Sequence, residues 1–253
     1  MRLLTVLFLA VTLILPTLQI SGATINQDSL SNENNELQFS VNAGFCDKYL
    51  WRGITCNKGL VFQPEVAVTY KDFSLSSWSN FKIWDVDGTN SNEIDLTLGY
   101  YHSFNSFDIE SYISYYHYLY SPTTSTSEFN LGLYYPIGDF TLFARSAIDV
   151  IKNAGGAYGE IGFDYEKELS DKFSVFGTLL AGFASEKFNS YNLEVEKGAF
   201  NLTSCDLGIS YSPFESFSID ADFLLNINMD KAVKEALGSS TSNMIEIVLR
   251  KEF

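Results

Sequence analysis

Acidic side chains at alternating positions are the residues of this chain with the clearest potential for chemistry. Asp220 and Asp222 illustrate the spacing, because two carboxylates two residues apart share one face of a strand and could act as general acid and base. The same spacing recurs along the chain, however, and alternation on a polar strand face produces such pairs without catalysis. Two arginines follow the same pattern. The complete set of these positions is Glu65, Asp95, Glu110, Arg145, Asp149, Glu160, Asp164, Asp206, Asp220, Asp222, Glu246 and Arg250.

An enzyme acting on membrane lipids would need a nucleophile and a general base within hydrogen-bond reach of each other. The chain has 2 histidines, His102 and His117, and both fall on apolar strand faces near strand ends, where a place in a belt of aromatic rings is expected. The sequence has no Gly-x-Ser-x-Gly elbow, and neither His is followed by a Ser-bearing cluster. We therefore expect no catalytic residue and no enzyme, with an outer-membrane lipid hydrolase as the less favoured alternative.

The cysteines predict neither a metal site nor a cofactor, because no Cys or His spacing resembles a zinc site. Cys46 and Cys56 bracket the Trp51-Arg52-Gly53 segment. They are the candidate disulfide if the chain is exported, since oxidising compartments allow the bridge to persist. The third cysteine, Cys205, is left without an assigned role.

A two-residue hydrophobic period predicts the elements that must position the carboxylates. Between residues 60 and 70, Phe62, Val66 and Val68 point to one face, and Gln63 and Glu65 point to the other. This period is typical of a strand with one apolar and one polar side. Counting the segments that repeat it gives about twelve strands, an even number of the kind used by single-chain outer-membrane barrels. The sequence therefore predicts an all-β fold, a single antiparallel transmembrane barrel over residues 36–253.

The connections between these strands alternate between short and long. Such alternation is expected of periplasmic turns and external loops, so both termini of the barrel are predicted to be periplasmic. The 185–199 segment is the strongest candidate for a long surface loop, and 230–241 has a helix-like composition. The short turns follow Tyr70, Tyr101, Tyr135, Tyr165 and Tyr211, and the longer connections follow Cys46, Trp84, Tyr120, Ile151, Ala184 and Asn228.

Aromatic residues flank the short turns, as in the pairs Tyr70/Phe73 and Tyr135/Phe140. Amphipathic rings favour the headgroup level of a bilayer, so these residues are predicted to form a girdle at the inner side of the membrane. The competing interpretation is a soluble β-sandwich, whose strands alternate equally well and whose core would hold the same rings.

The N-terminal segment predicts export. Residues 1–23 combine Arg2, a mostly apolar run and a small-residue cleavage site at Ser21-Gly22-Ala23, which is the anatomy of a signal peptide. The alternative of an uncleaved anchor is less favoured because the run is shorter than the roughly 20 residues of a spanning helix. Residues 24–35 are polar and are expected to be flexible.

The net charge of -15 argues against nucleic acid as a partner, because neutralising phosphates requires clustered Lys and Arg. In a barrel, the polar strand faces would line a wet, acidic lumen, since unpaired buried carboxylates are very costly. For any one carboxylate, a structural ion pair with Arg145, Arg250 or Lys82 is the favoured role. About twelve strands imply a narrow duct, and a negative potential in it would favour cations over anions.

The segment Asp47-Lys48-Tyr49-Leu50-Trp51-Arg52-Gly53-Ile54, followed by Gly59, Gln63-Pro64 and the Trp78-bearing strand, resembles the TorF-type porin family of bacterial outer-membrane proteins of unknown function. The clear match spans roughly residues 45 to 120. The resemblance implies an outer-membrane barrel and a pore, with Tyr49, Trp51, Arg52 and Gly53 as a structural motif, but no established substrate. Cys46 and Cys56 depart from the family pattern. Phe253 looks like the C-terminal aromatic assembly signal of such barrels.

These observations predict an outer-membrane, porin-like channel for passive diffusion of small neutral or cationic solutes. A non-conducting structural or adhesive barrel is the main alternative. The expected partners are outer-membrane lipid, small solutes and the barrel-assembly machinery, and the sequence does not predict an oligomeric state.

Overall fold

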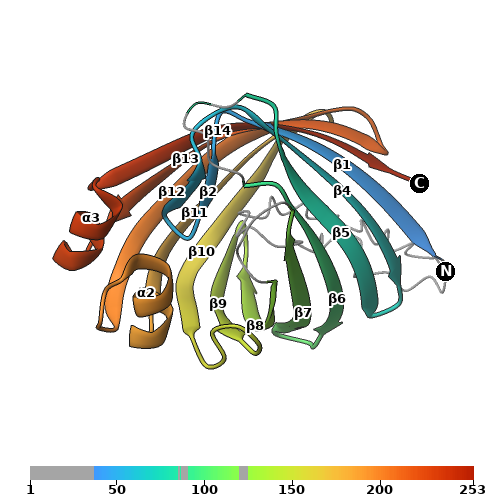
Figure 1. Cartoon of the computed structure of the whole chain (residues 1–253). Coiled ribbons are helices and arrows are strands. Elements are labelled where there is room, and N and C mark those ends of the chain that lie inside the picture. Colours follow the sequence, from blue (N-terminus) through green and yellow to red (C-terminus); the bar gives the residue numbers. More distant parts are fainter. Residues whose placement is uncertain (1–36, 85, 87–90, 120–124) are drawn as a thin grey trace, which may run out of the picture.

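The computed structural model describes residues 37–84, 86, 91–119 and 125–253, and within them twelve strands close into one antiparallel barrel (Figure 1). Each strand pairs with its neighbours along the chain, and β1 closes the ring by pairing with β14. The predicted all-β barrel of about twelve strands is confirmed. The predicted signal peptide and flexible segment lie outside the described residues. The barrel strands are β1 Gln38–Cys46, β4 Val61–Tyr70, β5 Phe73–Lys82, β6 Glu93–Ser103, β7 Asp108–Tyr118, β8 Thr126–Ile137, β9 Phe140–Asp149, β10 Ala157–Ser170, β11 Phe173–Ala184, β12 Ala199–Phe214, β13 Phe217–Asn228 and β14 Thr241–Glu252.

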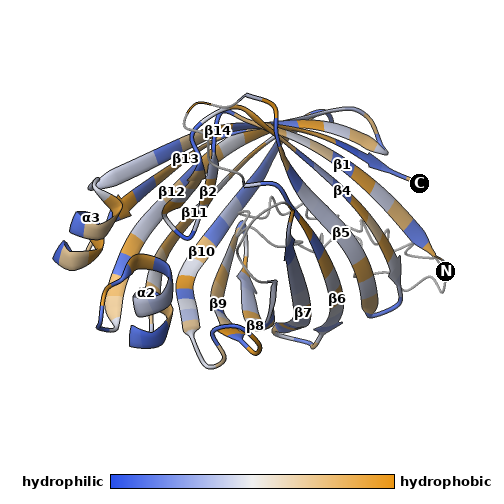
Figure 2. Ribbon diagram, viewed as in Figure 1, coloured by the Kyte–Doolittle hydropathy of each residue, from blue (hydrophilic) through white to orange (hydrophobic). Residues whose placement is uncertain are grey.

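The two faces of the barrel wall differ sharply in polarity, as the alternating colours along the strands in Figure 2 show. On β6, Asp95 faces inward and is 0% exposed, whereas the next residue, Leu96, is 51% exposed on the outside. The same alternation leaves Phe, Leu, Ile or Val side chains exposed on the exterior of every barrel strand. Exposing so continuous an apolar surface to water would be very unfavourable, so the exterior must face lipid. The soluble sandwich interpretation is therefore wrong.

Short and long connections lie at opposite ends of the barrel, as the sequence predicts. Two to four residues join β4 to β5, β6 to β7, β8 to β9, β10 to β11 and β12 to β13. We call this the short-turn end. It also holds the start of β1 and the end of β14, since Ser40 pairs with Glu252. The other end, with the longer connections, is called the long-loop end.

Aromatic rings gather at the short-turn end, where the sequence predicts a girdle. Phe73 and Tyr100 have ring centroids 5.2 Å apart, and Phe173 and Tyr211 have centroids 4.8 Å apart. Phe140 packs beside its neighbours on β10 at similar distances. These contacts join adjacent strands on the outer surface, which is the placement expected of rings at a membrane interface.

The first long connection folds into the barrel as a β-hairpin, a feature that the sequence did not predict. Strands β2 (Tyr49–Trp51) and β3 (Ile54–Asn57) form a separate two-stranded sheet. Arg52 and Gly53 make the turn between them, with φ of 49° and 83°. Positive φ at both central residues is the geometry that tight hairpin turns require, and Gly53 adopts it without strain.

The hairpin is anchored at its root and at its tip. At the root, the Asp47 amide donates to the Ile245 carbonyl at 3.1 Å, and the Ile245 amide donates to Asp47 Oδ1 at 2.9 Å. At the tip, a Cβ on Gly53 would lie 2.8 Å from Leu202 Cδ2, so the turn presses against the β12 wall. Between them, Leu50 is buried in a cluster that includes Leu180, Leu202, Leu224 and Met244. Burial of one such side chain stabilises by roughly 1.5–3 kcal/mol, which holds the hairpin inside.

Two short helices cap other connections at the long-loop end. The predicted surface loop 185–199 contains α2 (Glu186–Leu193), whose amide at Phe188 is capped by the Ser185 hydroxyl at 3.2 Å. The helix-like segment 230–241 does contain a helix, α3 (Lys231–Leu237), capped by Asp230. A hydrogen bond from Lys197 holds the pKa of Asp230 below its usual range, and the α3 amides add to this effect. Within the described ranges, no helix combines the length and apolar character needed to cross a membrane.

The candidate disulfide between Cys46 and Cys56 is absent, and Cys205 is also a free thiol. Cys46 lies at the end of β1 and its Sγ is 3.2 Å from Gln63 Oε1, as donor. Cys56 lies on β3 and its Sγ points to the Ile54 carbonyl, 3.9 Å away. The two thiols therefore point to different acceptors and not to each other. The sequence spacing that suggested a disulfide does not determine these side-chain directions.

Candidate functional site: the barrel interior

The structure places every predicted alternating carboxylate and arginine on the inward side of the barrel. Most of them are buried, and Arg145, Asp222 and Arg250 are partly exposed to the interior. Most of their outward neighbours in the strands are apolar, so these residues follow the two-residue period. The structure does not test which of them line a path for solutes.

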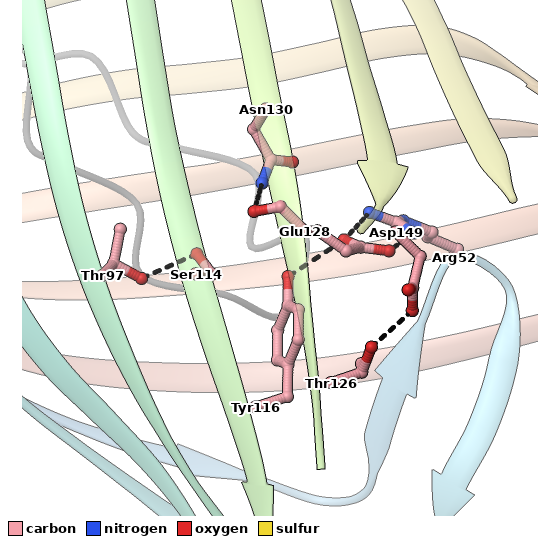
Figure 3. A network of polar contacts seen from close by, with 8 residues as sticks. All are labelled: Arg52, Thr97, Ser114, Tyr116, Thr126, Glu128, Asn130 and Asp149. Carbon is pink, nitrogen blue, oxygen red and sulfur yellow. Dashed lines mark hydrogen bonds and ion pairs between the residues drawn. The ribbon is translucent and has the colours of Figure 1, made fainter. Parts of the chain in front are cut away.

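The most heavily bonded group in the interior is the ion pair between Arg52 and Glu128. Arg52 Nη1 donates to Glu128 Oε1 at 2.8 Å, and Nη2 donates to Oε2 at 2.7 Å. The two side chains are only 2% and 6% exposed. The Tyr116 hydroxyl donates to Oε2 of the same carboxylate at 3.0 Å, and Figure 3 shows both groups converging on it. A bidentate pair of this kind is strong and directional, so it fixes the hairpin tip against β8.

Aromatic rings surround the Arg52 guanidinium. Its Cζ lies 4.6 Å from the ring centroid of Trp51, 4.8 Å from that of Tyr158 and 5.4 Å from that of Phe188. These distances are within the range of cation–π attraction. The three rings come from β2, β10 and α2. The guanidinium therefore connects the hairpin to strand β10 of the barrel wall and to helix α2. Arg52 thus pairs with a lumen carboxylate, and the Trp51 ring packs beside Phe188, with ring centroids 5.6 Å apart.

Two predicted carboxylates have arginine partners. Glu160 Oε2 lies 3.1 Å from Arg145 Nη2, and Asp220 Oδ2 lies 3.2 Å from Arg250 Nη2. Asp220 also accepts a hydrogen bond of 2.6 Å from the Ser210 hydroxyl. These contacts give Asp220 a structural role and remove it from the pair with Asp222 that could have served as acid and base.

Other carboxylates are held by neutral donors. Glu65 accepts from Asn42 at 2.8 Å, and Glu110 accepts from the Tyr134 hydroxyl at 2.8 Å. Asp164 accepts from Thr178, and Asp149 accepts from Thr126 and from the amides of the following turn. Among the described residues, none of these four carboxylates has an arginine or lysine within salt-bridge distance, so the interior carries more acidic than basic side chains.

Three carboxylates gather on one side of the interior, toward the short-turn end from the hairpin. Asp222 and Glu246 are directly paired across β13 and β14, and Asp206 lies on the adjacent strand β12. Among the residues that the structure describes, none of the three has an arginine or lysine within salt-bridge distance. Oδ1 of Asp206 and Oε1 of Glu246 are buried without a protein hydrogen-bond partner. Buried oxygens of this kind are stabilised by water, by a cation or by protonation of the carboxyl group.

Cavities open at both ends of the barrel and shrink around the hairpin. At the long-loop end, a cavity of about 270 Å³ is lined by six aromatic rings and by Glu93, Glu128 and Asp149. At the short-turn end, a cavity of about 460 Å³ is lined by residues from the start of β1 and the end of β14, with Thr69 and Ser216. Two voids of about 20 Å³ each flank Arg52, lined in part by Glu110 and Leu50 respectively. Each of these two voids beside the hairpin has room for about one water molecule.

The two histidines lie on the outer surface near strand ends, as the sequence predicts. His102 Nδ1 is 2.9 Å from Asp72 Oδ2, and its ring contacts Tyr100 and Phe104 within the girdle. His117 Nδ1 is 3.0 Å from the Ser125 hydroxyl, a neighbour that the sequence did not reveal. Among the described residues, no cluster of His, Cys, Asp or Glu could hold a metal ion.

Sequence reasoning missed the carboxylate that matters most. The sequence predicts a Ser/Thr-rich loop over residues 121–127 and a strand from Phe129, so Glu128 falls between the two. Glu128 and Asn130 are two residues apart, and this spacing is the signal that places Glu128 on the inward face at the start of β8. Glu93 at the start of β6 was missed in the same way.

No protein-family model matches this chain, and no curated protein matches it. Solved structures match in fold. The KdgM porin is 13% identical with a TM-score of 0.54, and the match covers 85% of this chain and 99% of the porin. The NanC porin is 8% identical with a TM-score of 0.53, covering 84% and 98%. An outer-membrane channel from Pseudomonas putida F1 is 7% identical with a TM-score of 0.52, covering 91% and 100%.

At these identities the likeness shows the fold, which is that of porin-like outer-membrane barrels. The apolar exterior and the aromatic girdle agree with it, and together they place the chain in the bacterial outer membrane. The resemblance to the TorF-type family in particular stays a prediction.

Proposed function

We propose that the chain is a narrow outer-membrane channel for passive diffusion of small neutral or cationic solutes, with the long-loop end outside the cell. The observation that carries the proposal is the chemistry of the interior. Carboxylates on most strands face inward, and Arg52, Arg145 and Arg250 are each committed to one carboxylate. A lumen with surplus negative charge concentrates cations and repels anions.

The hairpin β2–β3 is the proposed constriction. Its tip reaches the β12 wall, its guanidinium is bound to β8, and only water-sized voids remain beside it. The KdgM porin has also been solved in complex with oligogalacturonate, an acidic ligand. The acidic interior of this chain argues for solutes of the opposite charge.

Reconstitution into planar bilayers tests the channel. Discrete conductance steps are expected, and replacement of residues 48–58 by a short Gly/Ser linker should enlarge them because it removes the constriction. A matched control replaces an equally long stretch, residues 229–239, of the connection between β13 and β14. Folded protein that stays electrically silent in both forms would reject the channel.

A non-conducting barrel is the second candidate, and the buried Leu50 cluster is the observation that favours it. If the hairpin never leaves the lumen, the unmutated protein would be silent while the linker variant conducts. That outcome would assign the chain a structural or adhesive role.

A further inference from the structure

Arg52 occupies a site whose parts would recognise a guanidinium group on a separate molecule. Both oxygens of Glu128 accept hydrogen bonds from it, at 2.8 and 2.7 Å. The Tyr116 hydroxyl, 3.0 Å from Oε2, holds the carboxylate in place independently of the arginine. In Figure 3 this tyrosine and Glu128 come from the barrel wall, whereas Arg52 enters from the hairpin. Glu128 and Tyr116, which bind the guanidinium, therefore belong to barrel strands β8 and β7 and not to the hairpin that carries Arg52.

Two of the three rings around the guanidinium also belong to the surroundings rather than to the hairpin. Tyr158 lies on β10 and Phe188 on α2, with ring centroids 5.3 Å apart. Removal of Arg52 would leave a carboxylate beside two aromatic faces. Such a combination binds organic cations, because the ring faces attract positive charge and the carboxylate supplies directed acceptors.

The site can be reached from the long-loop end. Glu128 and Phe188 both line the cavity of about 270 Å³ at that end. This volume is far above the roughly 10–15 Å³ that one water molecule requires, so a small organic molecule has room beside Glu128 and Phe188. The cavity lining contains Glu93 and Asp149 and no lysine.

Arg52 itself is held imperfectly. Its φ of 49° is in the left-handed region that residues other than glycine adopt rarely. Its Nε is buried without a hydrogen-bond partner. A free solute could present the same planar donors without the strained backbone, which gives it a means of competing.

We propose that Glu128, Tyr116, Tyr158 and Phe188 form a binding site for small organic cations bearing a guanidinium group, with Arg52 as a tethered occupant that the solute displaces. The assignment rests on the proposed function in that it names the solute class of the same lumen. Guanidinium is favoured over ammonium because its planar fork matches a carboxylate bound through both oxygens. Displacement frees the hairpin tip from β8.

Calorimetric titration of methylguanidinium into the detergent-solubilised full chain tests the site. The variant Arg52→Ala should bind it at least about tenfold more tightly than the unmutated protein, because an occupant present about nine-tenths of the time lowers the apparent affinity by that factor. Methylammonium should bind more weakly and acetate not at all. The double variant Arg52→Ala/Glu128→Gln should lose binding. Equal affinity of Arg52→Ala and the unmutated chain, or binding retained without the Glu128 carboxylate, would overturn the proposal.

Folding of each variant is checked by the shift in gel mobility on heating that folded barrels show. If Arg52→Ala does not fold, Arg52→Met keeps an unbranched stem among the rings and takes its place in the same comparison. Binding in detergent requires no conduction, so the two proposals fail separately. If the protein binds methylguanidinium but shows no conductance in bilayers, only the channel is rejected. If it conducts but Arg52→Ala does not bind methylguanidinium, only the binding site is rejected.

Discussion

Loss of the Glu128 charge should release the hairpin from the lumen while the barrel stays folded. In Glu128→Gln, the Arg52 guanidinium keeps its charge at a site that is 2% exposed and loses the carboxylate that both of its Nη groups bind. Removing one member of a buried ion pair typically costs about 3–5 kcal/mol. Since 1.4 kcal/mol is a factor of ten, the equilibrium between inserted and released hairpin should shift by roughly 150-fold to several-thousand-fold. The wall is held by strand ladders on both sides of β8, so global unfolding should change less.

Hydrogen exchange of the amides of Trp51 and Ile54 measures this release, and single-channel recording measures its effect on conductance. We expect lost protection and longer or larger openings. Glu215→Gln, which removes an exposed carboxylate at the short-turn end, is the matched control and should change neither. The double variant Arg52→Met/Glu128→Leu should recover the inserted hairpin, because an apolar pair of similar volume often replaces a buried ion pair without loss. Unchanged protection in Glu128→Gln would refute the view that this pair holds the constriction.

Three other changes probe the hairpin and its surroundings. Gly53→Val should destabilise the inserted hairpin by about 1–3 kcal/mol, because φ is 83° and the new Cβ would lie 2.8 Å from a wall Leu, and exchange at the tip checks this. The pKa of Asp230, measured by NMR titration, should lie below the usual range for a carboxyl group, and Lys197→Met should raise it. Because the pKa is lower in the folded state, the ionised α3 cap stabilises the fold at neutral pH, and this stabilisation is lost as the pH falls through the folded-state pKa. Alkylation in denaturant without reductant should modify both Cys46 and Cys56, and a bridged peptide in the mass spectrum would contradict the two free thiols.

The barrel could be predicted because its determinants are local. A period of two residues separates Leu96 from Asp95 as it separates every outward residue from its inward neighbour, and turn residues mark where each strand ends. The aromatic pairs that flank the short turns are also close in sequence, so the position of the membrane interface could be predicted from them as well. The closing contact of β1 with β14 follows from an even number of antiparallel strands with no exposed edge.

The hairpin could not be predicted because nothing local distinguishes a loop that folds inward from one that projects outward. Leu50 and Trp51 would be suitable for either a lumen plug or an external surface, and the outcome depends on Leu180, Leu202 and Leu224, which lie on distant strands. The acceptor for Arg52 is likewise 76 residues away in the sequence. The missing disulfide has the same origin, since cysteine spacing says nothing about which side of the hairpin root each thiol faces.

The reversal potential of the reconstituted channel under a KCl gradient tests the central claim most directly. The account predicts a potential of the sign for cation preference, and a smaller one when Asp222 and Glu246 are replaced by Asn and Gln, because these carboxylates have no arginine or lysine partner among the described residues. A potential of the anion-selective sign, or one unchanged by both substitutions, would contradict an acidic lumen as the basis of function.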